Sequence, residues 1–232
     1  MHDDLVHLEA ADAFDRRLTE LKAAKRKLDA GRADAKHALT NATQALEQLD
    51  AALADSDAQQ KAIARETEKY ERRLQSAQRV LEGGGGDPEA AERQVVGVTE
   101  QLDRLETEML EQLERVDTLS EQREAAVATH QAATQAHQQA ESAYDPAVQA
   151  LRDEFNGIVP RRDAELAALD SLMRDKYISL RDRKGSAVAR ILRNACNACR
   201  MVVHQQHLAD LKRGLVVPCR GCGRWLIPEE TG

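Results

Sequence analysis

The sequence predicts a mostly α-helical protein, in which a long antiparallel coiled-coil helical hairpin is followed by a small β-rich C4 zinc ribbon. Two observations support this fold class. Aromatic residues make up 3% of the 232 residues and charged residues 31%, a composition typical of long solvated helices and not of a thick globular core. All four cysteines lie within residues 196–232, so they can organise only a small C-terminal module.

The first long helix is predicted by a heptad pattern that runs from Phe14 to Leu81. Apolar residues recur there in alternating steps of four and three without a slip in register, which is typical of a left-handed coiled coil. Four consecutive glycines at 83–86 follow and make continuation of the helix costly. We therefore expect the tip of a hairpin near residues 82–88.

A second long helix is expected to begin after these glycines, with Asp87 as its cap and Pro88 in its first turn. Its apolar pattern runs from Val95 to Tyr144, so the two helices should pair antiparallel. Polar residues interrupt both patterns and should loosen the coiled coil locally; they are Lys25, Arg32, Gln60, Arg123, His130 and His137. Asp145-Pro146 and Val159-Pro160 should produce kinks or helix restarts near 145–146 and 159–160, and Gly185 should end the helical region.

The boundary in charge coincides with the boundary in cysteine content. Residues 185–232 hold seven Lys or Arg and three Asp or Glu, a formal charge of +4 in a chain whose total is -7. We therefore predict a hairpin domain over residues 1–184 and a zinc-ribbon domain over residues 185–232.

The ribbon is predicted by two CxxC motifs, Cys196 to Cys199 and Cys219 to Cys222, with nineteen residues between them. This spacing suits a tetrahedral zinc site, and four thiolates leave no vacant position, so the ion would be structural. A redox CxxC pair and an iron site are the competing interpretations. The redox pair would need a βαβ pattern, which the sequence lacks. Gly221 and Gly223 should adopt positive φ, which leaves the first motif as the looser half.

The rest of the ribbon should contain short strands and one helical turn. Runs of β-forming residues lie at 201–203, 215–217 and 225–227, and a short helix should end before Gly214. His204 and His207 have only two residues between them, which is closer than in the usual zinc-binding histidine pair. We expect both histidines to be exposed polar residues.

Four segments together resemble the bacterial coiled-coil proteins that end in a C4-type zinc ribbon. They are residues 177–188, CNAC at 196–199, HLADLKRG at 207–214 and PCRGCGRWLI at 218–227. The resemblance implies one structural Zn²⁺ held by Cys196, Cys199, Cys219 and Cys222. It also implies an adaptor role, because members of this family regulate flagella or type III secretion. A sigma factor of the sigma-54 class, or a secretion or flagellar component, is the partner that the resemblance implies.

We therefore expect a non-enzymatic zinc-binding adaptor or regulator that docks protein partners through its ribbon and its helical stalk. Nucleic acid is a candidate second ligand, because basic residues could contact phosphates and a tryptophan could stack on bases. The competing interpretation is that the basic residues form an ordinary solvated surface and that the tryptophan fills the ribbon core. The candidate contact residues are Arg190, Arg193, Arg200, Lys212, Arg213, Arg220, Arg224 and Trp225. Two alternatives stay open: a DksA-like transcription factor that acts on RNA polymerase through the hairpin tip, and a structural coiled-coil spacer that self-associates.

The sequence also bears on catalysis and location. It contains no nucleophile–base constellation, and the four glycines lack the Lys-Ser/Thr that follows a P-loop, so we expect no enzymatic activity. Apolar runs are far shorter than the roughly 20 residues that a bilayer requires, and the acidic start at Met1 does not resemble a signal peptide. We expect a cytoplasmic protein without membrane contact.

Overall fold

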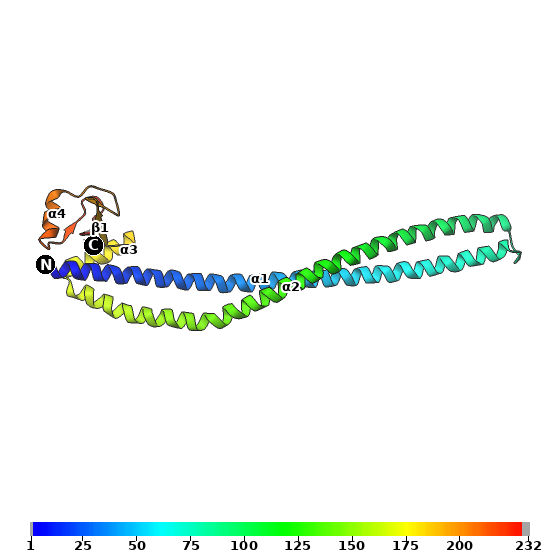
Figure 1. The fold of residues 1–232 in the computed structure, drawn as a ribbon, viewed down its shortest axis with the longest axis horizontal. Helices are drawn as coiled ribbons and strands as arrows, with labels where there is room; N and C mark the ends of the chain where they lie inside the picture. Colours follow the sequence, from blue (N-terminus) through cyan, green and yellow to red (C-terminus); the bar gives the residue numbers. More distant parts are fainter. Residues whose placement is uncertain (1, 229–232) are drawn as a thin grey trace. The chain divides into compact units, whose positions relative to one another are not determined.

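The computed structural model describes residues 2–228, so residues 229–232 of the predicted ribbon domain lie outside the described part. Two long helices come first, α1 (His2–Leu81) and α2 (Pro88–Ala168), followed by α3 (Ser171–Lys184) (Figure 1). The remaining elements are β1 (Val188–Leu192), β2 (Ala195–Cys196), α4 (Gln205–Lys212), β3 (Val217–Pro218) and β4 (Trp225–Ile227). The predicted fold class, a long helical hairpin followed by a small β-rich module, is confirmed.

The strands form one small sheet in the order β2-β1-β4-β3. β1 and β4 are parallel, and the other two pairs are antiparallel. The strand at 225–227 agrees with the prediction. The run at 215–217 contributes only Val217 to a strand, and the run at 201–203 contributes only a single bridge at Val202. The sequence pattern did not predict β1, the strand that joins β2 to β4.

The chain packs as two compact units, residues 1–31 with 141–232, and residues 32–140. The ribbon therefore packs in one unit with the start of α1, up to residue 31, and with the end of α2, from residue 141 onward. The predicted boundary at 184/185 instead follows the end of α3.

In the unit formed by residues 32–140, α1 and α2 run side by side in opposite directions and meet at the glycine tip (Figure 1). Gly83, Gly85 and Gly86 have φ values of 99°, 79° and 128°, which glycine adopts without a steric cost. The Asp87 carboxylate accepts a hydrogen bond from the N–H of Glu89 at 3.0 Å, as expected of a helix cap. The predicted tip is therefore present.

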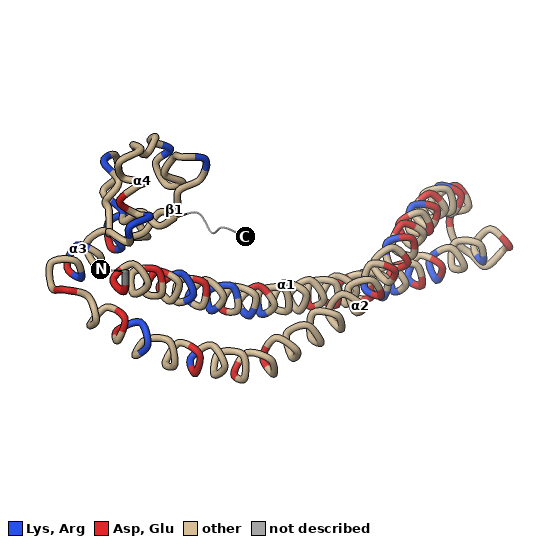
Figure 2. The backbone as a smooth tube through the Cα atoms, turned by 60° about the vertical axis from the view of Figure 1, so that its left-hand side comes forward, with Lys and Arg blue, Asp and Glu red and all other residues tan. Residues whose placement is uncertain are grey.

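Contacts between the two helices of this unit fix their antiparallel alignment. Arg123 Nε donates to Asp50 Oδ1 at 2.5 Å, and Gln60 Nε2 lies 3.5 Å from the carbonyl oxygen of Gln112. Arg123 is half-buried, and its guanidinium group reaches the Asp50 carboxylate on the facing helix. Figure 2 shows acidic and basic residues interspersed along both helices.

In the other unit, α2 continues through Pro146 and Pro160 without restarting. An apolar cluster around Leu18, Leu21 and Ile158 joins this part of α2 to α1, and such packing offsets the hydrogen bond that a proline removes. The helix ends only at Ala168. Asp170 then starts α3, because its carboxylate accepts from the N–H groups of Leu172 and Met173 at 2.9 and 3.0 Å.

The ribbon shares one apolar core with the hairpin's first and last turns. Leu5, Leu8 and Ala11 of α1 belong to the same buried cluster as Tyr177 and Leu180 of α3, and so do the strands and three of the four cysteines. A module of this size has little apolar surface of its own. The helices supply part of the core that the ribbon lacks.

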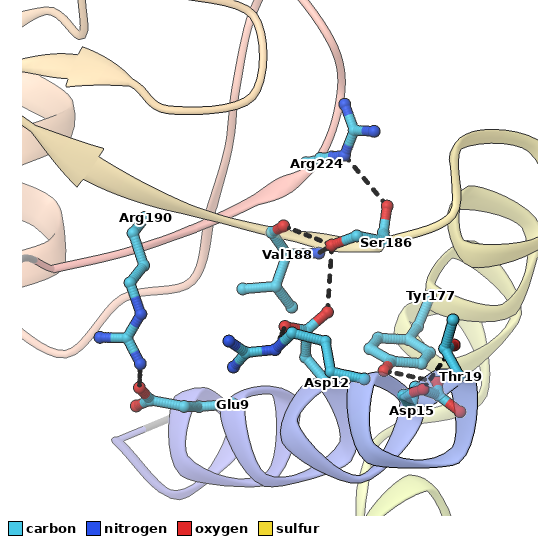
Figure 3. A network of polar contacts seen from close by, with 10 residues as sticks. Glu9, Asp12, Asp15, Thr19, Tyr177, Ser186, Val188, Arg190 and Arg224 are labelled. Atoms are coloured by element: carbon cyan, nitrogen blue, oxygen red, sulfur yellow. Dashed lines mark hydrogen bonds and ion pairs between the residues drawn. The ribbon is translucent and has the colours of Figure 1, made fainter. Parts of the chain in front are cut away.

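Polar contacts reinforce this shared core (Figure 3). The hydroxyl of Tyr177, a fully buried residue, donates to Asp15 Oδ2 at 2.8 Å. Ser186 Oγ donates to Asp12 Oδ1 at 3.1 Å, and Arg190 Nη2 donates to Glu9 Oε1 at 2.7 Å. These bonds join α1 to α3, to β1 and to the segment between them.

Every helix within residues 2–228 is too short or too polar to cross a lipid bilayer.

The first testable prediction concerns Asp12. Burial raises the pKa of its carboxyl group, and the neighbouring Arg16 and Ser186 only partly oppose this effect. A carboxyl group with a raised pKa in the folded state favours folding most below its ordinary pKa, and this contribution is lost as pH rises through the folded-state pKa. Asp12→Asn should therefore be at least as stable as the wild type at pH 7, and this relative advantage should shrink toward pH 4.

Urea unfolding at both pH values, followed by the fluorescence of Trp225, measures this difference. Asp175→Asn is the matched control, because Asp175 is exposed on α3. A loss of stability at pH 7 confined to Asp12→Asn would show that the ion pair with Arg16 outweighs the cost of burial.

The second prediction concerns Ser56, which is fully buried in the coiled coil. Its Oγ has no hydrogen-bond partner among the described residues, so its removal should stabilise the protein by roughly 1 kcal/mol. Ser56→Ala is compared with Ser76→Ala, an exposed position on the same helix, by thermal unfolding followed with circular dichroism. Both substitutions raise helix propensity by the same amount, but only Ser56→Ala removes a buried hydroxyl group. Equal increases in Tm for the two variants would therefore contradict the prediction.

Candidate metal centre

The two CxxC loops are built with equivalent backbone hydrogen bonds. In the first, the N–H of Arg200 donates to the carbonyl oxygen of Cys196 at 2.7 Å; in the second, the N–H of Gly223 donates to that of Cys219 at 2.8 Å. The N–H of each leading cysteine also donates to the carbonyl oxygen five residues later, at 2.9 and 2.7 Å. The first loop therefore has the same backbone support as the second, and is not the looser half in this respect.

Each loop places a left-handed residue directly after its second cysteine. Arg200 has φ 62° and Gly223 has φ 76°. Glycine adopts this conformation without cost, whereas arginine does not. The equivalence of the two loops thus requires an uncommon backbone conformation at Arg200.

Gly221 has a different role from the one expected, because its φ is not positive. A Cβ atom at this position would lie 2.8 Å from Met201 Sδ and 3.3 Å from Cys199 Sγ. The absence of a side chain allows the two loops to approach each other. The sequence could not reveal this contact, because Met201 comes from a distant segment.

The four predicted ligands lie together, with their sulfur atoms within 4.8 Å of one another. The Sγ atoms of Cys196 and Cys222 are 3.8 Å apart, and those of Cys199 and Cys219 are 3.6 Å apart. A tetrahedral site with Zn–S bonds of about 2.3 Å has sulfur–sulfur edges of about 3.8 Å. The cluster therefore has the size and donor set of a four-sulfur metal site, and Cys199 is its one exposed member.

The surroundings shift the pKa values of Cys196 and Cys222 in opposite directions. Burial raises the pKa of Cys196 to about 12. Burial also acts to raise the pKa of Cys222, but hydrogen bonds from the backbone and side chain of Arg224 outweigh it and lower this pKa to about 7. Because a metal binds thiolates, loading this site would release protons.

Side-chain hydrogen bonds in both directions join the second loop to the end of α3. Lys184 donates to the carbonyl oxygen of Cys222. Arg224 donates through Nε to the carbonyl oxygen of Ser186 at 3.1 Å (Figure 3) and through Nη2 to that of Lys184 at 2.8 Å. The loop with Cys219 and Cys222 is thereby fixed to the end of α3.

The other candidate contact residues of the ribbon fall into two groups. Three arginines already have partners: Arg190 pairs with Glu9, Arg213 lies 3.1 Å from Asp210, and Arg224 binds the backbone. The remaining four are exposed; they are Arg193, Arg200, Lys212 and Arg220. In Figure 2 the ribbon carries several Lys and Arg positions.

Of the two roles considered for Trp225, the structure shows the core position and not an exposed ring available for stacking. Trp225 is only 7% exposed within the shared core, and Lys176 Nζ lies 4.0 Å from the centroid of its ring. The tryptophan fills the ribbon core, because a module with so few apolar residues needs its largest side chain inside. His204 is exposed, His207 is half-buried, and neither joins the sulfur cluster.

No family model matches the chain, and no curated protein matches its sequence. Solved structures with TM-scores of 0.60 and above share its fold. The HP0958 protein from Helicobacter pylori CCUG 17874 is 15% identical with a TM-score of 0.64, and the match covers 97% of each chain. CT398 from Chlamydia trachomatis is 16% identical with a TM-score of 0.60, over 99% of each chain. A protein from Mycobacterium smegmatis is 22% identical over 96% of this chain and 98% of its own, with a TM-score of 0.49.

The third prediction concerns metal removal. Binding of a structural ion contributes on the order of 10–16 kcal/mol to small zinc modules, so a chelator should unfold the sheet. The helices should largely persist, because α1 and α2 also pair through contacts that do not involve the ribbon, such as the ion pair of Arg123 with Asp50. Trp225 fluorescence should shift to that of an exposed indole, while the helical circular dichroism signal stays close to that of the untreated protein. A helix loss equal to that in denaturant would contradict the prediction.

Proposed function

We propose that this protein is a non-enzymatic, zinc-binding coiled-coil adaptor or regulator that docks protein partners through its ribbon and its helical stalk. The observation that supports this proposal is the cluster of four sulfur atoms with edges near 3.8 Å. Four-sulfur tetrahedral sites favour zinc or iron, and closed four-cysteine zinc sites are structural. A bound ion of this kind would hold a docking surface in shape.

The chain's own residues have distinct roles in this proposal. Cys196, Cys199, Cys219 and Cys222 would hold the ion, and Arg224 and Lys184 would hold the second loop against the end of α3. The ion would supply the cohesion that the small core of the ribbon lacks. The ribbon surface is then free to recognise a partner.

We further propose that the chain belongs with the bacterial coiled-coil proteins that end in a C4 zinc ribbon. The shared fold with the H. pylori and C. trachomatis proteins along nearly the whole chain supports this assignment. A cytoplasmic location, and a sigma factor or a secretion or flagellar component as the partner, are proposed from the family resemblance.

A protein partner fits the ribbon better than nucleic acid. Trp225 lies in the core, and Arg190, Arg213 and Arg224 bind groups of this chain. Four exposed basic residues remain for phosphate contacts, and nucleic-acid affinity depends strongly on the number of such contacts. Nucleic-acid binding is therefore the secondary proposal.

The fourth prediction tests docking by affinity capture. Intact protein should retain specific partners and about one zinc ion per chain, whereas Cys219→Ser should lose both. Ala209→Ser, on the exposed face of α4, is the matched control and should keep both. Metal content is measured by plasma mass spectrometry. Capture of the same proteins by Cys219→Ser, or protein purified without stoichiometric metal, would contradict the proposal.

A further inference from the structure

One edge of the ribbon combines exposed apolar side chains with arginines that have no side-chain partner within residues 2–228. Leu192, Met201 and Val202 are 47%, 48% and 72% exposed. Arg193 and Arg200 directly adjoin them in the sequence. We call this set of residues, 192–193 and 200–202, the ribbon edge.

The backbone at Val202 is open to pairing with another strand. Val202 forms an antiparallel bridge with Ala195, and the bonds around the bridge run from Cys196 N–H to Met201 and from Val203 N–H to Asn194. In this pattern the bridged residues are a non-hydrogen-bonded pair, so their own N–H and C=O groups point away from each other. Within residues 2–228, the N–H and C=O of Val202 make no hydrogen bond.

The apolar side chains of the ribbon edge form a row across the sheet. Leu192 pairs with Ala195, and Ala195 is bridged to Val202. Directly opposed residues of neighbouring strands share one face. Leu192 and Val202 therefore flank the small Ala195 on the same face of the sheet, and an added strand could continue this row.

The arginines of the ribbon edge occupy backbone conformations that arginine rarely adopts. Arg193 and Asn194 form the two-residue turn between β1 and β2, with φ values of 49° and 61°, and Arg200 has φ 62°. They are the three non-glycine residues with positive φ in the described part of the chain. Such conformations cost of order 1 kcal/mol each and cluster at functional sites.

The side chains of Arg193, Arg200 and Arg220 make no ion pair or hydrogen bond within residues 2–228. Arg220 also lines a hollow of about 70 Å³ with Met201, Val202 and His207. Positive charge thus lies on more than one side of the open backbone, where an acidic ligand would find charge-assisted hydrogen bonds.

We propose that the ribbon edge binds an extended acidic segment of a partner protein by strand addition; this inference rests on the proposed function of the ribbon as a docking module. The N–H and C=O of Val202 would pair with the backbone of the added segment. Its carboxylates would bind Arg193 and Arg200, and its apolar residues would cover Leu192 and Val202. Recognition through backbone pairing plus alternate side chains is a recurring mode of peptide binding.

A nucleic acid fits this surface less well. The open N–H and C=O pair at Val202 matches a peptide group, and the exposed residues beside it are aliphatic. Single-stranded nucleic acid is usually bound by aromatic platforms, whereas the one tryptophan of the chain is buried.

The fifth prediction tests the ribbon edge with the full-length, metal-loaded protein. The probe is a short fluorescent peptide in which aspartate and glutamate alternate with valine and leucine, and binding is followed by anisotropy. Arg200→Gly should weaken binding about tenfold, the effect of one charge-assisted bond, while Tm stays equal or rises because glycine relieves the left-handed conformation. Lys212→Ala, at an exposed lysine of α4 outside the ribbon edge, should bind as the wild type does.

Backbone pairing is tested separately. Val202→Pro removes an N–H that makes no bond within the described chain, so this variant should keep its metal and lose binding. An N-methylated peptide provides the same test without altering the protein. In the wild type, the Val202 amide resonance should shift when the unmodified peptide is added.

Four results would overturn the inference. They are equal affinity for a peptide with lysines in place of the acids, unchanged binding by Arg200→Gly, unchanged binding of the N-methylated peptide, and binding of a single-stranded RNA where the acidic peptide fails. If Cys219→Ser loses its captured partners while the acidic peptide does not bind, the inference fails and the proposed docking function stands.

Discussion

The small sheet depends on the meeting of two CxxC loops, whose four sulfur atoms lie within 4.8 Å of one another. The strands contain between two and five residues, too few for backbone pairing alone to hold them. Four thiolates so close together repel one another unless a cation lies between them. In our proposal the ion therefore determines whether the β-rich module exists, and the loops and strands follow from its coordination.

The second constraint is the core that the ribbon shares with the helices. Tyr177, fully buried, contributes its ring to this core and its hydroxyl to Asp15, so one residue serves both packing and polar pairing. Ser186 binds Asp12 through its side chain and Arg224 through its carbonyl oxygen. This short chain of bonds runs from α1 to the residue beside the second loop. We infer that the conformation of that loop and the packing of α1 are coupled.

Features set by local sequence were predictable. The heptad steps from Phe14 to Leu81, the glycine tip and the CxxC spacing each gave the right element, because each reflects contacts at short or periodic separation. Features set by tertiary contacts were not. β1 is defined by its pairing with β4, and Gly221 by the nearby Met201. The helix break at 169–170 could not be predicted either, because apolar residues continue across it at helical spacing, at positions 166, 169, 173, 177 and 180. Trp225 was a candidate contact residue in the sequence, and only the packing of distant segments around it shows that it lies in the core.

The two CxxC loops differ in the residue that adopts the left-handed conformation, which is Arg200 in the first loop and Gly223 in the second. This difference helps to decide whether Arg200 serves the metal site or a ligand. If coordination geometry alone selected the residue after the second cysteine, glycine would serve at both places, as it does at 223. Arg200 instead accepts the cost of a left-handed backbone, in a loop whose neighbours Met201 and Val202 are exposed. The loop with glycine faces the end of α3, where Arg224 and Lys184 hold it. Stability alone would favour glycine at position 200, so the binding role that we propose gives this arginine an explanation that metal coordination does not.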